Sequence, residues 1–122
     1  MWKQRATLNP SQAKVYDLAG GITNQFGDIL TYGQIKFLQV HAAGDNGGTI
    51  SVGGAGNAFS DFLGGTNQSV KLRPGADFFL MIPGTNAYLV GAGVTDELYL
   101  VNDSAVATAT NSADIFVGGI GQ

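Results

Sequence analysis

Short segments in which apolar and polar residues alternate recur along the chain, and glycines separate them. One of the clearest is residues 70–73, in which Lys71 and Arg73 alternate with apolar neighbours and are expected in solvent. A period of two is typical of a strand with one buried face. No segment shows sustained apolar spacing at the helical period, so the pattern predicts strands and no helix.

About eight short strands are predicted from this pattern. They cover residues 14–18, 34–41, 49–52, 70–73, 78–82, 88–90, 97–102 and 114–117. The continuously apolar run at 78–82 predicts a strand covered on both faces. Many short strands divided by turn residues are typical of sandwiches and barrels. We therefore predict an all-β fold, an antiparallel, jelly-roll-like β-sandwich; the alternative is an immunoglobulin-like sandwich, although the cysteine landmarks of that fold are absent.

The length of 122 residues is that of one domain, and no segment indicates a domain boundary, so a single sandwich domain is predicted. Residues 14–122 are expected to form the sandwich, and residues 1–13 an N-terminal arm that precedes the first predicted strand. Trp2 lies in this arm beside Lys3 and Arg5. Its indole is expected either to fold back onto the sandwich or to anchor in a neighbouring molecule, because tryptophan is enriched at protein interfaces.

The longest irregular segment, residues 53–68, is rich in Gly, Asn and Ser and holds Phe59, Phe62 and Leu63. Long loops on a rigid scaffold often carry function. These three apolar side chains are therefore candidates for contact with a partner. The alternative is that they plug one end of the sandwich.

The composition excludes several classes of protein. The chain has no cysteine, which excludes disulfides, thiol nucleophiles and zinc–cysteine sites. Its six Lys and Arg residues are scattered, whereas duplex binding requires a cluster, so no nucleic-acid partner is expected. No apolar run approaches the length of a membrane span, no signal-peptide pattern is present, and no membrane partner is expected. A surface with few charges favours association, so we expect a homo-oligomer.

The residues that most often carry catalysis or metal binding are few. His41 is the only histidine and is expected to make an ordinary hydrogen bond at the end of its strand. Asp96 and Glu97 would point to opposite faces of a strand, so we expect the strand to begin at Glu97, with Asp96 in the preceding turn. The segment 45–48 favours a hairpin turn over a calcium site. We predict that the chain is not an enzyme and binds no metal or cofactor.

The C-terminal half contains a pattern of turn glycines and alternating apolar residues. It runs VKLRPGADFFL at 70–80, YLV at 88–90, DELYLVN at 96–102 and DIFVGGIG at 114–121. This pattern resembles that of small β-sandwich virion proteins of tailed bacteriophages. The chain departs from it at Ala76, where a second glycine is usual, and in the alanine-rich segment before the last strand.

The resemblance implies a virion structural protein, either a capsid decoration (cement) protein or a related head or tail accessory subunit. Such a protein binds an assembled shell as an oligomer. The implied partners are the major capsid protein or other virion subunits, and the implied location is the virion, assembled in the host cytoplasm.

We predict that residues of the arm and of the long loop bind the partner. They are Trp2, Lys3, Arg5, Phe59, Phe62 and Leu63. The alternatives are a phage tail structural subunit or a carbohydrate-binding, lectin-like module. In the second case, Tyr32 and Tyr88 are the candidates for stacking against a sugar, although sheet aromatics are more often half-buried.

Overall fold

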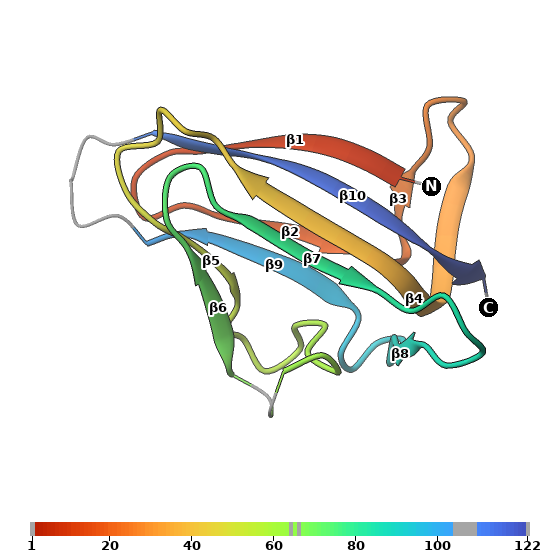
Figure 1. Cartoon of the computed structure of the whole chain (residues 1–122). Coiled ribbons are helices and arrows are strands. Elements are labelled where there is room, and N and C mark those ends of the chain that lie inside the picture. The colour runs from red at the N-terminus through yellow and green to blue at the C-terminus, as the bar shows by residue number, and fades with distance from the viewer. Residues whose placement is uncertain (1, 64, 66, 104–109, 122) are drawn as a thin grey trace.

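The computed structural model describes residues 2–63, 65, 67–103 and 110–121, which fold into two antiparallel β-sheets packed face to face (Figure 1). No helix long and apolar enough to cross a membrane occurs in these ranges. The strands are β1 (Trp2–Leu8), β2 (Ala13–Asp17), β3 (Ala19–Thr23), β4 (Ile29–Ala42), β5 (Ile50–Gly53), β6 (Ser69–Leu72), β7 (Asp77–Met81), β8 (Tyr88–Leu89), β9 (Glu97–Asn102) and β10 (Asn111–Gly121).

The strand order is that of a jelly roll. Sheet A holds β1, β10 and β4 in that order, with β3, β8 and β7 paired in succession along the other edge of β4. Sheet B has the order β2-β9-β5-β6. Without the short strands β3 and β8, the pairs nest from the outside inward: β1 with β10, β2 with β9, β4 with β7, and β5 with β6. A long hairpin rolled into two sheets has this pairing, so the predicted antiparallel sandwich is confirmed.

The core lies between the sheets and follows the alternation of the strands. In β10, Ile115 and Val117 are fully buried, whereas Phe116 between them is only partly buried. Leu98 and Leu100 of β9 are buried from the opposite side. Each such side chain stabilises the fold by about 1.5–3 kcal/mol relative to an exposed position.

Near the middle of β4, the regular alternation of buried and solvent-facing positions is interrupted. Ile35 and Leu38 are both buried, although residues three apart lie on opposite faces of a regular strand. The strand accommodates the change with a β-bulge at Lys36, where the register against β10 shifts. As a consequence, Phe37 lies on the solvent side of sheet A.

Two glycines of β10 lie against this bulge. Gly118 is opposite Phe37, and Gly119 is opposite Ile35. A Cβ at Gly119 would lie 2.1 Å from the carbonyl oxygen of Gln34, which is backbone and cannot rotate away. A Cβ at Gly118 would make ordinary contact, 3.6 Å from the Cβ of Phe37.

A buried pair of asparagines joins the two sheets at one end. Asn111 of β10 donates from Nδ2 to Oδ1 of Asn102 in β9, at 2.9 Å. Asn102 in turn donates from Nδ2 to the carbonyl oxygens of Leu8 (3.1 Å) and Asn9 (3.0 Å). Both side chains are buried, and in the described residues every buried side-chain nitrogen and oxygen has a partner. The pair therefore fixes the end of β1 against both sheets.

The prediction of an N-terminal arm at residues 1–13 is wrong for the part that the structure describes. Residues 2–8 form β1, which pairs with β10 along its whole length. The sequence misled because Lys3, Gln4 and Arg5 interrupt the apolar alternation, as is common on an edge strand.

Two other predicted strands differ from the observed ones. The run at 78–82, expected to be covered on both faces, is the edge strand β7. Phe78 and Leu80 pack against the core, whereas Phe79 and Met81 are exposed. The strand predicted at 34–41 begins earlier, at the first residue of β4, because it pairs there with β3, a strand that the pattern did not predict.

The bulge makes a prediction about stability. Gly119→Ala should lower the free energy of unfolding by about 1–3 kcal/mol, because the new methyl group overlaps the Gln34 carbonyl. Gly118→Ala is the matched control and should change it by less than about 1 kcal/mol. Urea denaturation of the two variants measures the difference, and equal stabilities would contradict the geometry of the bulge.

Candidate functional site

Trp2 folds back onto the sandwich, which is one of the two alternatives that the sequence left open. Its side chain is only 4% exposed, and its ring packs against Tyr16 with 5.1 Å between centroids and 60° between planes. Tyr16 belongs to β2 of sheet B, so the contact joins the two sheets beside the free edge of β1. Burial raises the pKa of Tyr16. The indole is therefore part of the core and not a free anchor for a neighbour.

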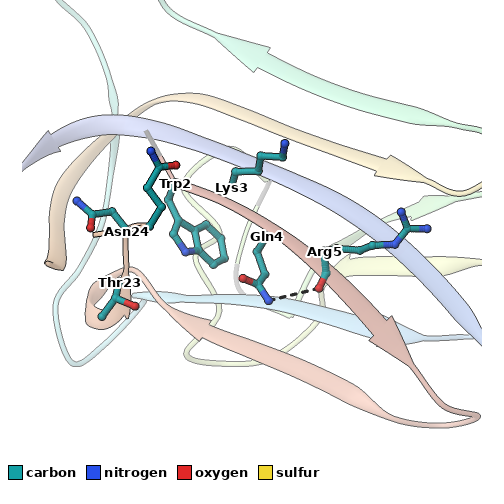
Figure 2. A pocket seen from close by; sticks show the side chains of 7 residues that line it. Trp2, Lys3, Gln4, Arg5, Thr23 and Asn24 are labelled. Carbon is teal, nitrogen blue, oxygen red and sulfur yellow. Dashed lines mark hydrogen bonds between the residues drawn. The ribbon is translucent and has the colours of Figure 1, made fainter. Parts of the chain in front are cut away.

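A cleft of about 400 Å³ lies between β1 and the end of β3 (Figure 2). Figure 2 shows Lys3 and Arg5 on one side of β1 and Trp2 and Gln4 on the other. Gln4 donates from Nε2 to the carbonyl oxygen of Arg5, at 3.3 Å. The residues that line the cleft are Trp2, Lys3, Gln4, Arg5, Thr23, Asn24 and Gln25.

The chemistry of this cleft is that of a binding surface. Two of its described lining residues are cationic, Lys3 and Arg5, and none of them is a carboxylate. The remaining polar groups are amides and one hydroxyl, so the cleft suits a hydrogen-bonding or acidic group. It holds no pair of a nucleophile and a base among the described lining residues.

Beside the cleft, β3 and the start of β4 form a hairpin that stands away from the two packed sheets (Figure 1). We call residues 24–29 the hairpin tip. Oδ1 of Asn24 accepts from the backbone N–H groups of Phe26 (2.9 Å) and Asp28 (3.0 Å). Gly27 takes a φ of +84°, which glycine adopts without strain. The side chain of Asn24 thus holds the tip in one shape.

The hairpin tip exposes apolar surface. Phe26 is 79% exposed and Ile29 is 68% exposed, more than any other large apolar side chain in the described residues. Single exposed apolar residues are common, but two on a projecting, internally bonded hairpin make the tip a candidate contact surface. The pattern did not predict this site, although an asparagine followed by a glycine-containing loop is a hairpin signal.

The long loop proves to be mainly core. Phe59 is fully buried and its ring lies 5.3 Å from that of Phe62. Phe62 lies 5.5 Å from Phe78 and 6.4 Å from Tyr88. Of the predicted trio, only Leu63 lines a surface cleft, of about 370 Å³ and distinct from the cleft at β1. The alternative reading of these residues, that they plug the sandwich, is correct for Phe59 and Phe62.

The other candidate residues have structural partners. His41 makes the expected ordinary hydrogen bond, from Nδ1 to Oδ1 of Asp77 at 2.7 Å. Asp96 lies in the turn before β9 and accepts from the N–H of Gly93, and β9 begins at Glu97, as expected. In the described part of the chain, no group of three His, Cys, Asp or Glu residues gathers to hold a metal ion.

The aromatic residues proposed for sugar stacking also pack against other residues of the chain. Tyr32 is buried, its hydroxyl donates to the carbonyl oxygen of Val117 at 3.5 Å, and burial raises its pKa. Tyr88 is half-buried against Phe62.

The solvent side of sheet A carries a second candidate surface, which we call the outer face. It spans β1, β10, β4 and β7. One line of side chains in register across these strands, the charge row, consists of Arg5, Asp114, His41 and Asp77. The next line consists of Lys3, Phe116, Gln39 and Phe79.

Apolar side chains continue beyond these two lines. Phe37 packs against Phe79 with 5.2 Å between ring centroids, and Lys3 Nζ lies 5.8 Å from the ring of Phe116. Phe79 and Met81 are each more than half exposed. The sequence did not predict this surface, because it expected the run at 78–82 to be covered.

The hairpin tip makes a testable prediction. Asn24→Ala removes the acceptor of two backbone N–H groups, each worth about 1 kcal/mol, so hydrogen exchange at Phe26 and Asp28 should accelerate about five-fold or more. Gln25→Ala, at the neighbouring exposed position, is the control and should leave both rates unchanged. Unchanged exchange in the Asn24 variant would show that the tip is not held by this side chain.

Comparison of the chain with protein-family models, with curated proteins and with solved structures found no match in any of the three. The surfaces described above are therefore the basis for assigning a function.

Proposed function

We propose that the protein is a structural subunit without catalytic activity that binds an assembled protein shell, as a capsid decoration (cement) protein of a tailed bacteriophage does. The observation that carries this proposal is the hairpin tip. It presents Phe26 and Ile29 outside the sandwich body, in a loop that the side chain of Asn24 fixes. A preformed tip loses little conformational freedom on binding, which favours docking into a pocket between subunits.

The cleft at β1 extends this docking surface. Its lining includes Thr23 at the end of β3 and Asn24 of the hairpin tip, together with Lys3 and Arg5 of β1. A partner segment that covers the hairpin tip would reach this cleft, whose amides and hydroxyl offer hydrogen bonds. Lys3 and Arg5 lie on the other side of β1 from Trp2 and Gln4, so they keep the partner-binding role predicted for them on that side, as residues of a strand and not of an arm.

The fold and the sequence resemblance agree with this function without being specific to it. Jelly rolls occur in viral capsid proteins and also in lectins. A lectin role would need an open aromatic platform, whereas Trp2 and Tyr32 are buried. The resemblance at residues 70–121 favours the virion, and a tail subunit is the second outcome that the experiments below distinguish.

Binding to shells tests the hairpin tip. Phe26→Asp/Ile29→Asp should reduce co-sedimentation with purified phage shells about ten-fold or more, because burial of each apolar side chain contributes about 1.5–3 kcal/mol. Val94→Asp is a matched control, since Val94 is 67% exposed and lies in a different loop. Loss of binding in the control, or its retention in the hairpin variant, would contradict the proposal.

The copy number of the protein in purified particles tests its role more directly. A decoration protein should be present in hundreds of copies per particle, as measured by quantitative mass spectrometry. A few copies would indicate a portal or tail-tip subunit instead. Absence from the particles would overturn the proposal.

A further inference from the structure

The outer face of sheet A has an order of charges that suggests its own partner. Across β1, β10, β4 and β7, the charge row reads base, acid, base, acid: Arg5, Asp114, His41, Asp77. Adjacent members are paired within the chain. Arg5 Nη1 lies 3.8 Å from Asp114 Oδ1, and His41 Nδ1 lies 2.7 Å from Asp77 Oδ1. Read from the other end, the row has an acid in place of each base and a base in place of each acid.

The lines of side chains next to the charge row are apolar enough to favour burial. Phe79 is 51% exposed and Met81 is 58% exposed, and both belong to an edge strand. Edge strands of soluble proteins usually carry charged residues or proline at such positions, because an exposed apolar edge associates with other chains. The outer face therefore resembles a surface that another protein covers, bounded by a line of charges that selects the partner.

We infer that the outer face binds the outer face of a second copy of this chain, about a two-fold axis that runs parallel to the strands between β10 and β4. This axis reverses the order of the strands and leaves each line of side chains opposite itself. Arg5 then faces Asp77 of the second copy, and Asp114 faces His41 of the second copy. Each of these two pairs occurs twice by symmetry, so every acid of the charge row meets a base and every base an acid.

The same axis also places large side chains of one copy opposite small ones of the other. Phe37 of one copy faces Gly118 of the other, because these two residues lie opposite each other across β4 and β10. A large ring therefore meets a position without a side chain, which allows two sheets to approach to the usual packing distance of about 10 Å. Lys3 faces Phe79 of the second copy, an arrangement that permits a cation–π contact.

Other two-fold arrangements place like charges together. An axis in the plane of the interface but perpendicular to the strands keeps each strand opposite itself. With the axis at the charge row, Arg5 would face Arg5 of the second copy. With the axis between the charge row and the line of Lys3, it would face Lys3 of the second copy. Like charges that face each other across an interface cost binding energy, so the axis parallel to the strands is favoured.

The area of the outer face limits how tightly two copies can bind. Four strands about 4.8 Å apart and about six residues of about 3.3 Å each cover roughly 400 Å². A stable interface of standard size buries about 800 Å² on each partner. We therefore expect a weak, transient dimer, and weaker association at high salt because charges contribute to it.

Exchange of the two outermost charges tests this dimer. In sedimentation velocity over a concentration series, Arg5→Asp and Asp77→Arg should each weaken dimerisation about ten-fold or more, because each places like charges opposite each other. The double variant Arg5→Asp/Asp77→Arg restores the pair across the interface and should recover most of the affinity. Arg5 and Asp77 lie on β1 and β7, at opposite ends of the charge row, so the recovery cannot arise within one chain.

Control variants distinguish loss of dimerisation from loss of the fold and from loss of shell binding. Arg73→Asp changes the charge equally in an exposed residue that follows β6 of sheet B, and should not affect dimerisation. Circular dichroism checks the fold, and the milder variants Arg5→Gln and Asp77→Asn give the same test if a reversed charge disrupts it. Phe26→Asp/Ile29→Asp should leave the dimer intact, so a failure of shell binding can be told apart from a failure of dimerisation.

Two results would overturn the inference. One is a wild-type protein that stays monomeric at several hundred micromolar and low salt. The other is a dimer that the single variants do not weaken or that the double variant does not restore, which would exclude the proposed axis.

Discussion

The β-bulge at Lys36 is the constraint on which both candidate surfaces depend. It lets β4 bury Ile35 before the bulge and Leu38 after it. One long strand can therefore belong to both the hairpin and the outer face. Before the bulge, β4 pairs with β3 in the hairpin; after it, β4 lies at the centre of the outer face. The side chain of Lys36 is used as well, because Nζ donates to the carbonyl oxygens of Gly84 and Asn86 between β7 and β8. A regular strand would bury Phe37 or expose Leu38, and the outer face would lose its central ring.

Most of the strands could be predicted from the sequence, because alternation and turn glycines are local signals. All eight predicted segments overlap observed strands, but the prediction missed the pairing that gives each strand its exposure. β7 is continuously apolar and still lies at an edge, since its neighbours are set by contacts far along the chain. β1 was missed for the opposite reason: its polar residues suit a free edge, whereas Trp2 and Leu8 are held by Tyr16 and by the buried asparagine pair.

The candidate site was also hard to predict, because the burial of a side chain depends on contacts far along the chain. Phe59 and Phe62 were predicted to bind a partner because their segment looks like a loop, yet a loop folded over a sandwich can contribute core. Lys3 and Arg5 are exposed, as charged side chains usually are, and their contact with a partner stays a prediction. The hairpin tip was predictable in principle from Asn24 and Gly27, but only the structure shows that the hairpin stands clear of the two sheets (Figure 1).

The two proposals become mutually supportive once the direction of the axis is considered. A two-fold axis parallel to the strands keeps the strands of both copies pointing the same way. Both hairpins, which lie at the start of β4, would therefore project from the same end of the dimer. Two tips aimed in one direction can engage one shell together, and linked sites of this kind raise apparent affinity by about 10²–10⁴ without new contacts. An axis perpendicular to the strands would send the hairpins to opposite ends, and each contact would then act alone. The charge row thus selects the arrangement in which two modest docking contacts become a strong one.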